Sequence, residues 1–248
     1  MAMAQRRWWR SGDPSRDDSH VDTLLSPKYT LDSGEVRRLM MDAMDGTITA
    51  AGVIEGLIAS GVSERIILIA GTSAIFAGGL ATAGNAYTEM AAERDSIKAN
   101  LAAEARQLDE NPEGEREELI EIYVGKGLDR GLAETVVEQL NAKDALAAHI
   151  DEELHLTEDQ LSLHPPAMSI ASFLAYAFGA LIPIIAVWLA PTHLHTYVTA
   201  SAVIGSVALI AYIAARTSHL NARLMVLRTV GIAVGSLVLG YVAGLVVG

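Results

Sequence analysis

Charged residues are distributed very unevenly along this chain of 248 residues. All 30 aspartate and glutamate residues lie at or before Asp159, and beyond it the only lysine or arginine residues are Arg216, Arg223 and Arg228. A water-soluble domain has about 25% charged residues. The C-terminal third of the chain therefore cannot form an ordinary soluble domain.

Four runs without a charged residue are long enough to cross a bilayer, which takes about 20 mainly apolar residues. These runs are residues 66–88, 167–190, 196–215 and 229–248. A fifth apolar stretch, residues 39–62, is rich in glycine and alanine but contains Asp42, Asp45 and Glu55. The sequence predicts an all-α, multi-pass membrane protein with five transmembrane helices.

The lysine and arginine residues predict the orientation, because they concentrate in the cytoplasmic segments of membrane proteins. Five spans with the N-terminus in the cytoplasm leave Arg65 as the only one of the 18 on the outside. An even number of spans would destroy this asymmetry. We therefore expect a cytoplasmic N-terminus and an external C-terminus. An acidic chain with no targeting signal favours the cell membrane of a prokaryote.

The spans divide the chain into four segments. Residues 1–33 are polar and aperiodic, which predicts a disordered tail, and residues 34–89 and 166–248 hold the spans. Residues 90–165 form a polar insert with 19 of the 30 acids. Breaks at Asn111-Pro112, at 125–131 and at Asn141 predict three or four helices in a cytoplasmic domain. No breaker interrupts residues 88–110, so the first of these helices should continue the second span.

Polar residues in the first two spans mark a candidate ion path. A carboxylate inside a bilayer costs about 2.5–3.5 kcal/mol, so it indicates a functional site by default. Asp45 and Glu55 are ten residues apart, which places them in adjacent sectors of one helix at different depths. Thr82, Asn85 and Glu89 form a polar stripe on the second span. We expect these five residues to line a path, although Glu89 could equally mark the inner membrane boundary alone.

Carboxylates and one histidine recur at helical spacings in the insert. Glu115 and Glu118 share a helix face, His149 and Glu153 are one turn apart, and Glu104 stands on the preceding helix. Acids and histidines on packed helices build the carboxylate metal sites of helical bundles. Such ligands suit Fe²⁺ or Mn²⁺. On spacing alone, an acidic helix is more often a solvated face, so both interpretations stay open.

Several classes of chemistry are excluded. The chain has no cysteine, which rules out thiolate metal sites and cysteine nucleophiles. It has no Ser/His/Asp order, phosphate-binding glycine loop or HExxH motif, so we expect no enzyme. A ferritin-like oxidase needs Glu-x-x-His helices, whereas His149 and Glu152 occur in the reverse order. Neither a permanent cofactor nor a nucleic-acid partner is expected.

The whole organisation, over about residues 37–248, resembles the vacuolar iron transporter family. That family has five spans and an acidic helical insert between the second and the third. Order and spacing of several short matches together carry the resemblance. They are Asp45-Gly46 with Thr49, Tyr87, residues 115–123, Gly127-Leu128, residues 151–156, and Ala171 to Leu174 with Gly179-Ala180 and Pro183.

The resemblance implies a homodimer in lipid that exports Fe²⁺, and often Mn²⁺, from the cytoplasm in exchange for protons. It also implies that glutamates of the insert bind the metal and deliver it to the pore. Four residues match that acidic set: Glu104, Glu115, Glu118 and Glu153. His149 stands where some members have methionine, and Asp45 matches the acid of the family's first span.

The second span departs from the family pattern. Ala81-Thr82 and Asn85-Ala86 stand where the family usually has a methionine and a Gly-Glu or Gly-Gly pair. Glu55 stands where the family usually has a small residue, and we expect it to replace the missing carboxylate from the opposite helix. Two functions remain open. One is a proton-coupled Fe²⁺/Mn²⁺ transporter, and the other is a non-transporting relative whose insert senses metal or docks a partner.

Overall fold

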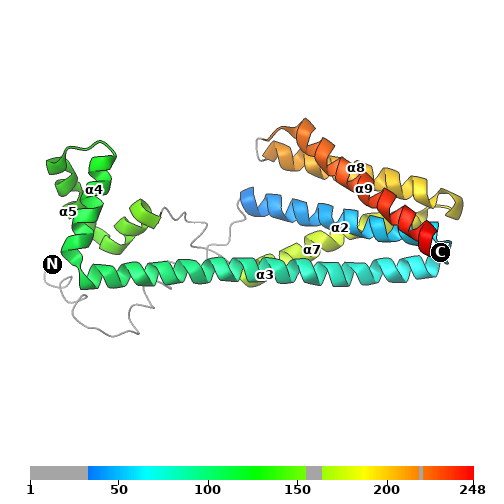
Figure 1. The fold of residues 1–248 in the computed structure, drawn as a ribbon, viewed down its shortest axis with the longest axis horizontal. Helices are drawn as coiled ribbons and strands as arrows, with labels where there is room; N and C mark the ends of the chain where they lie inside the picture. Colours follow the sequence, from blue (N-terminus) through cyan, green and yellow to red (C-terminus); the bar gives the residue numbers. More distant parts are fainter. Residues whose placement is uncertain (1–32, 155–163, 218–219) are drawn as a thin grey trace. The chain divides into compact units, whose positions relative to one another are not determined.

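A computed structural model of the chain describes residues 33–154, 164–217 and 220–248 (Figure 1). The tail expected for residues 1–33 lies, apart from Ser33, outside the described residues. The described residues form helices and contain no strand, which confirms the all-α prediction. They fall into two compact units. We call residues 90–164 the insert unit, and residues 33–89 with 165–248 the bundle unit.

Five helices contribute to the bundle unit. They are α2 (Ser33–Ala59), the first half of α3 (Glu64–Glu110), α7 (Pro165–Leu189), α8 (His195–Thr217) and α9 (Ala222–Val247). A short 3₁₀ turn, η3 (Thr192–Leu194), joins α7 to α8. By length and composition, α3, α7, α8 and α9 could each cross a membrane. The charged helix α2 is not among these four, so the fifth predicted span does not meet that criterion.

Glycines allow α2 to approach α9 very closely. A Cβ atom on Gly240 would stand 2.0 Å from the carbonyl oxygen of Gly52, and one on Gly244 would stand 2.0 Å from that of Gly56. Both pairs advance toward the C-terminus together, so α2 and α9 run parallel. Small residues at such positions permit backbone contact between helices in lipid.

Small residues also join α7 to α2 and α3. The hydroxyl of Thr47 on α2 donates to the carbonyl of Gly179 at 3.0 Å. Tyr176 is buried, and its hydroxyl oxygen would lie 2.0 Å from a Cβ atom on Gly78 of α3. Further along, Ser169 donates to the carbonyl of Ala83 at 2.9 Å. These contacts place α7 against both α2 and α3 in the bundle unit.

The insert unit contains the second half of α3, α4 (Pro112–Gly125), α5 (Arg130–His149) and the π-helix η2 (Ile150–Leu154). The unbroken α3 confirms that the second predicted span continues into the insert. Asn111 caps α4 by accepting a hydrogen bond from the Gly114 amide at 3.2 Å. Asp129 caps α5 in the same way through Gly131 at 3.1 Å. The first two predicted breaks are therefore confirmed.

The third break occurs at Asp144 rather than at Asn141. Asp144 has φ −165° and ψ 100°, which interrupts the helical backbone inside α5. Its carboxylate accepts a hydrogen bond from the Ala147 amide at 3.0 Å and restarts the helix, as an N-cap does. A short segment, residues 145–154, therefore follows as a separate piece, and we call it the His149 segment.

The His149 segment joins two apolar clusters of the insert unit. Leu146 and Ile150 pack against α3, and Ala148 packs into the core between α4 and α5. The α3 side of the first cluster consists of Ile97, Leu101, Ala105 and Leu108. The second cluster is built on Leu119, Ile120, Ala133 and Val137. The segment is thus fixed by burial on both sides.

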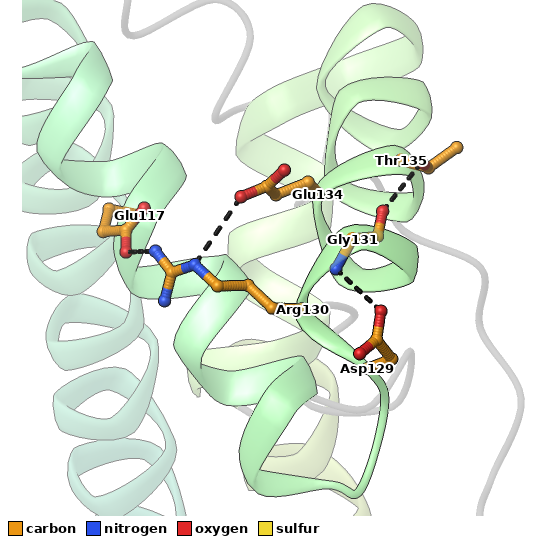
Figure 2. A network of polar contacts seen from close by, with 6 residues as sticks. All are labelled: Glu117, Asp129, Arg130, Gly131, Glu134 and Thr135. Atoms are coloured by element: carbon orange, nitrogen blue, oxygen red, sulfur yellow. Dashed lines mark hydrogen bonds and ion pairs between the residues drawn. The ribbon is translucent and has the colours of Figure 1, made fainter.

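A polar network holds the start of α5 against α4 (Figure 2). The Arg130 guanidinium pairs with Glu117 on α4, and its Nε atom lies 3.6 Å from Glu134. The hydrogen bond that Arg130 donates to Glu117 raises the pKa of Arg130 further, so this group stays charged. Thr135 donates to the carbonyl of Gly131 at 2.9 Å. The network orients α4, whose first turn carries Glu115.

Candidate metal centre and ion path

Three of the predicted ligands meet in the insert unit. Glu104 on α3, Glu115 on α4 and His149 on α5 each offer one ligand atom, and these atoms lie within 4.8 Å of one another. The Nδ1 atom of His149 is 3.1 Å from Oε1 of Glu104 and 4.0 Å from Oε2 of Glu115. All three residues are buried, and His149 has no exposed surface. We call these residues the metal triad.

The fold explains how the triad forms. Glu104 follows Leu101 on the face of α3 that packs against the His149 segment. Glu115 lies in the first turn of α4, which begins after the chain reverses at Asn111-Pro112. The break at Asp144 turns His149 toward both acids. Three helices therefore supply one ligand each, and none can leave without disturbing the core.

The donor set suits a divalent cation. Ligand atoms at about 2.1 Å from one ion lie roughly 3 to 4 Å apart, which matches both distances from His149 Nδ1. Two buried carboxylates repel each other and lose hydration, so burying them together is costly without a compensating charge. Two carboxylate oxygens with one imidazole nitrogen are acceptable ligands for Fe²⁺ and Mn²⁺.

Of the two other predicted ligands, only Glu118 has a described side chain, and it does not join this cluster. Glu118 is exposed on α4, because Leu119 and Ile120 occupy the buried face of that helix. Glu153 belongs to η2, and its side chain lies outside the described residues. The described triad is therefore smaller than the predicted set of five.

Sequence reasoning missed the contacts of Glu152. Its carboxylate accepts a hydrogen bond from the Tyr123 hydroxyl at 2.6 Å and pairs with Lys126. Burial, and then the charge of Asp151, raise the pKa of Tyr123, so its hydroxyl remains a donor. The contact ties η2 to the end of α4. The spacing of Tyr123 and Lys126, three residues apart on one helix, was the available signal.

The predicted path residues divide between two faces of the bundle unit. Asp45 and Thr49 lie one turn apart on the exposed face of α2, with Thr49 Oγ1 3.5 Å from Asp45 Oδ1. On α3, Asn85 is exposed and Thr82 is half-buried. Glu55 is 1% exposed and interacts with Thr196 of α8. The structure does not bring Glu55 to the face that carries Asp45.

Glu89 has a partner that was not expected. It forms an ion pair with Arg38 of α2, and this pair joins α2 to α3 within the bundle unit. Arg38 stands where some members of the resembled family carry an acid. The position of Glu89 is therefore neutralised by a cation of the chain itself.

The fold and the triad define a helical membrane protein with a carboxylate–histidine cluster. The family model described as the VIT family matches residues 36–245. The chain therefore belongs to the VIT family, which confirms the predicted relationship.

Curated relatives agree with this assignment. A vacuolar iron transporter of Acanthamoeba castellanii is 38% identical over 145 residues, 58% of this chain and 55% of that protein. A vacuolar iron transporter of Plasmodium berghei is 26% identical over 162 residues, 63% of this chain and 59% of that protein. One of Toxoplasma gondii is 26% identical over 155 residues, 61% and 51% of the two chains. The matches span about half the length of these relatives.

Proposed function

We propose that this protein is a transporter that moves Fe²⁺ or Mn²⁺ out of the cytoplasm in exchange for protons. The observation that carries the proposal is the metal triad, which buries two acids and a histidine on three helices of a VIT-family chain. The triad would capture the cation from the cytoplasm, because its two carboxylates balance a charge of +2. The relatives' names support iron as the cargo.

A fifth membrane span, α2, is part of this proposal. Its support comes from the packing of α2 along helices that are themselves long and apolar enough to cross a membrane. Gly52 and Gly56 contact Gly240 and Gly244 in register, so α2 follows α9 for at least a full turn. With 27 residues, α2 is about 40 Å long. Five spans then give a cytoplasmic N-terminus and insert and an external C-terminus.

The path is proposed to run along the face of α2 that carries Asp45 and Thr49. That face is exposed in a single chain, and a carboxylate facing lipid would cost about 2.5–3.5 kcal/mol. A second copy of the chain would cover it and place two Asp45 residues around one cation. Thr82 and Asn85 on α3 would add further oxygen ligands. The homodimer would therefore complete a path that one chain leaves open.

Arg38 and Glu89 are proposed to control the cytoplasmic end of the path. Their ion pair neutralises the acid that would otherwise attract a cation to this end. Metal would then enter only when Glu89 leaves Arg38 or when another ligand replaces it. We further propose the cell membrane of a prokaryote as the location, on the basis of the acidic chain.

The same ion pair favours a second function. If Arg38 permanently blocks the entry of cations, the protein would bind metal in its insert without transporting it. It would then act as a metal sensor or as a docking protein.

Flux measurements in proteoliposomes decide between the two functions. Vesicles containing a metal-sensitive dye are exposed to Fe²⁺ or Mn²⁺ under a pH gradient, with wild-type protein, Asp45→Asn and Glu64→Gln. Glu64 is an exposed acid at the start of α3 and serves as the matched control. The transporter predicts flux with the wild type and the control, and none with Asp45→Asn. Metal binding without flux in the wild type would support the sensor instead.

A further inference from the structure

Glu55 is a buried carboxyl group inside one protomer. Its side chain is 1% exposed, and neither carboxyl oxygen has a donor at full hydrogen-bonding geometry among the described residues. Within the described part of the chain, its polar interaction is with Thr196, in the first turn of α8. An ionised carboxylate without a partner is very unstable in an apolar interior. A proton or a bound cation must therefore neutralise it at least part of the time.

A second buried oxygen lies at the same level. Ala43, in the first half of α2, and Ile210, near the end of α8, line one apolar cleft. Glu55, near the end of α2, interacts with Thr196 at the start of α8. The two helices therefore run antiparallel, and Ala51 shares a cluster with Val203. Thr199 lies about one turn before Val203 on α8, and Glu55 lies about one turn after Ala51 on α2. Because the helices are antiparallel, these two steps lead to the same level of the bundle unit. The Thr199 hydroxyl is fully buried and makes no hydrogen bond to a described residue.

Among the described residues, no cationic side chain is placed to neutralise Glu55. Neighbouring positions on α2 pack against apolar or small residues, Ile54 against Ile67 and Val187, and Gly56 against Gly240. Among the described residues, no charged side chain contributes to the electrostatics of Glu55.

The other titratable groups described near this end of the bundle unit have their own contacts or are exposed. His195 is buried beside Thr196, and its Nε2 atom lies 3.1 Å from the carbonyl oxygen of Ala190. Glu64 and Arg65 are exposed at the start of α3. Tyr176 of α7 packs around Ala50 of α2. A proton is therefore the species that best fits the site.

The location also allows the proton to exchange. Glu55 precedes the end of α2 by four residues, and Thr196 is the second residue of α8. Both lie about one turn from their helix ends, where the connections to α3 and α7 begin. The partial positive charge at the N-terminus of α8, with the two hydroxyl groups, would stabilise the carboxylate. Burial instead stabilises the protonated, neutral form of Glu55. Both protonation states are therefore accessible to this group.

We propose that Glu55, with Thr196 and Thr199, binds the proton that is exchanged for metal, at a site separate from Asp45. This inference rests on the proposed transport function. The carboxylate of Glu55 takes up one proton to give the neutral acid, and releases it to restore the negative charge between α2 and α8. Because Asp45 lies on another face of the same helix, a change in α2 packing links proton binding to the metal path.

Infrared difference spectroscopy tests the proton site without requiring transport. Spectra of wild-type protein in lipid, with those of Glu55→Gln subtracted, are recorded across a pH series. We expect the carbonyl band of a buried carboxylic acid in the wild type, which disappears as the pH rises. A carboxyl group that keeps one protonation state over the whole series would overturn the proposal. A band that responds to Na⁺ and not to pH would also overturn it, in favour of a sodium site.

Two further variants keep the test valid if Glu55→Gln does not fold. Thr196→Val removes the hydroxyl group that interacts with Glu55, and Thr199→Val removes the buried hydroxyl group proposed to join it when the carboxylate is charged. Each should move the midpoint of the infrared titration to higher pH, and the exposed Thr72→Val should leave it unchanged. Equal midpoints in all three variants and the wild type would contradict the proposed site.

Flux in proteoliposomes then tests the coupling. Glu55→Gln should still carry metal down its gradient, but the ratio of fluxes at two pH values should fall to about one. Metal-driven proton movement, followed with a pH-sensitive dye, should be lost. If the wild type carries no metal at all, the transport function fails, while the infrared result still decides the proton site. Unchanged pH dependence in Glu55→Gln would refute the assignment.

Discussion

The two units of this molecule arrange their acids in opposite ways. In the insert unit, Glu104 and Glu115 come from different helices and meet at one histidine. In the bundle unit, Asp45 and Glu55 share one helix but lie on different faces, one exposed and one buried. One chain thus brings the candidate metal ligands of its insert together, whereas its bundle keeps one acid exposed and the other buried. We infer that capture needs one chain and that passage needs two.

Asp45→Asn should have the largest effect, because it removes the exposed negative charge on which the proposed metal path depends. Transport should fall to background, while metal binding by the triad should not change. Flux in proteoliposomes and metal binding in detergent measure the two quantities separately. A loss of both together would show that the two units do not act independently.

Removing ligands of the triad should weaken metal binding, the quantity that Asp45→Asn is expected to leave unchanged. His149→Ala and Glu104→Gln should each weaken metal binding by about 100-fold or more, since even indirect changes around a metal site cost 10- to 100-fold. Binding is measured by titration calorimetry on the full chain, with Glu118→Gln as the control. Because Glu118 is exposed and outside the triad, its change should leave the affinity within about twofold. A large effect at Glu118 would mean that the site extends beyond the three residues.

Removing an acid of the triad should make the metal-free protein more stable, although it weakens metal binding. Glu115→Gln removes one of two buried acids, so it should raise the free energy of unfolding of the insert by about 1–2 kcal/mol. The same change should reduce stabilisation by metal, which reaches about 2.7 kcal/mol at 100 times the dissociation constant. Thermal unfolding with and without Mn²⁺ measures both terms. A less stable apo variant would show that contacts within the protein, such as those with His149, already compensate the two acids.

The bundle unit should instead be sensitive at its glycine contacts. Gly240→Ala would place a Cβ atom 2.0 Å from the carbonyl oxygen of Gly52, so α9 must move away from α2. We expect a loss of about 3 kcal/mol, at the upper end of the 1–3 kcal/mol that overpacking typically costs. Gly235 on the same helix has open space around it, so Gly235→Ala is the matched control. Unfolding in detergent should separate the two variants clearly.

How far the sequence predicts this molecule depends on the kind of information needed. Uncharged runs and Asn111-Pro112 act locally, so four candidate spans and two helix breaks could be predicted. Helical spacing also places a residue on a face, which is why Glu104, Glu115 and His149 were identified. Spacing does not say which helix covers that face. Glu55 was expected to line the path with Asp45, yet it is buried against α8, and Glu118 was expected among the metal ligands, yet it is exposed.

The break at Asp144 shows the same limit at a single residue. Asn141 and Asp144 are both short polar residues able to cap a helix, and sequence alone does not rank them. Tertiary packing decides, because only a restart after Asp144 brings Leu146 and Ile150 onto α3. The contact between Tyr123 and Glu152 depends on that restart, so it could not be found without it.

The smallest effect should come from Tyr123, which supports the triad through Glu152. Tyr123→Phe removes a 2.6 Å hydrogen bond to a carboxylate, and such bonds contribute about 1.5–3 kcal/mol. Because the site is partly exposed, the contribution of this hydrogen bond is smaller. We expect the free energy of unfolding to fall by about 1 kcal/mol and metal binding to weaken a few-fold. Tyr87→Phe, at an exposed tyrosine of α3, is the control.

The pH dependence of that effect follows from the raised pKa of Tyr123. The folded protein holds the phenol proton more tightly than the unfolded chain, whose tyrosines titrate near 10. The contribution of Tyr123 is therefore fully present below about pH 10 and is lost as the pH rises through the higher, folded value. Melting temperatures of wild type and Tyr123→Phe should converge over that range. A constant difference would mean that Glu152 is held by Lys126 alone, and that the insert does not depend on this contact to position His149.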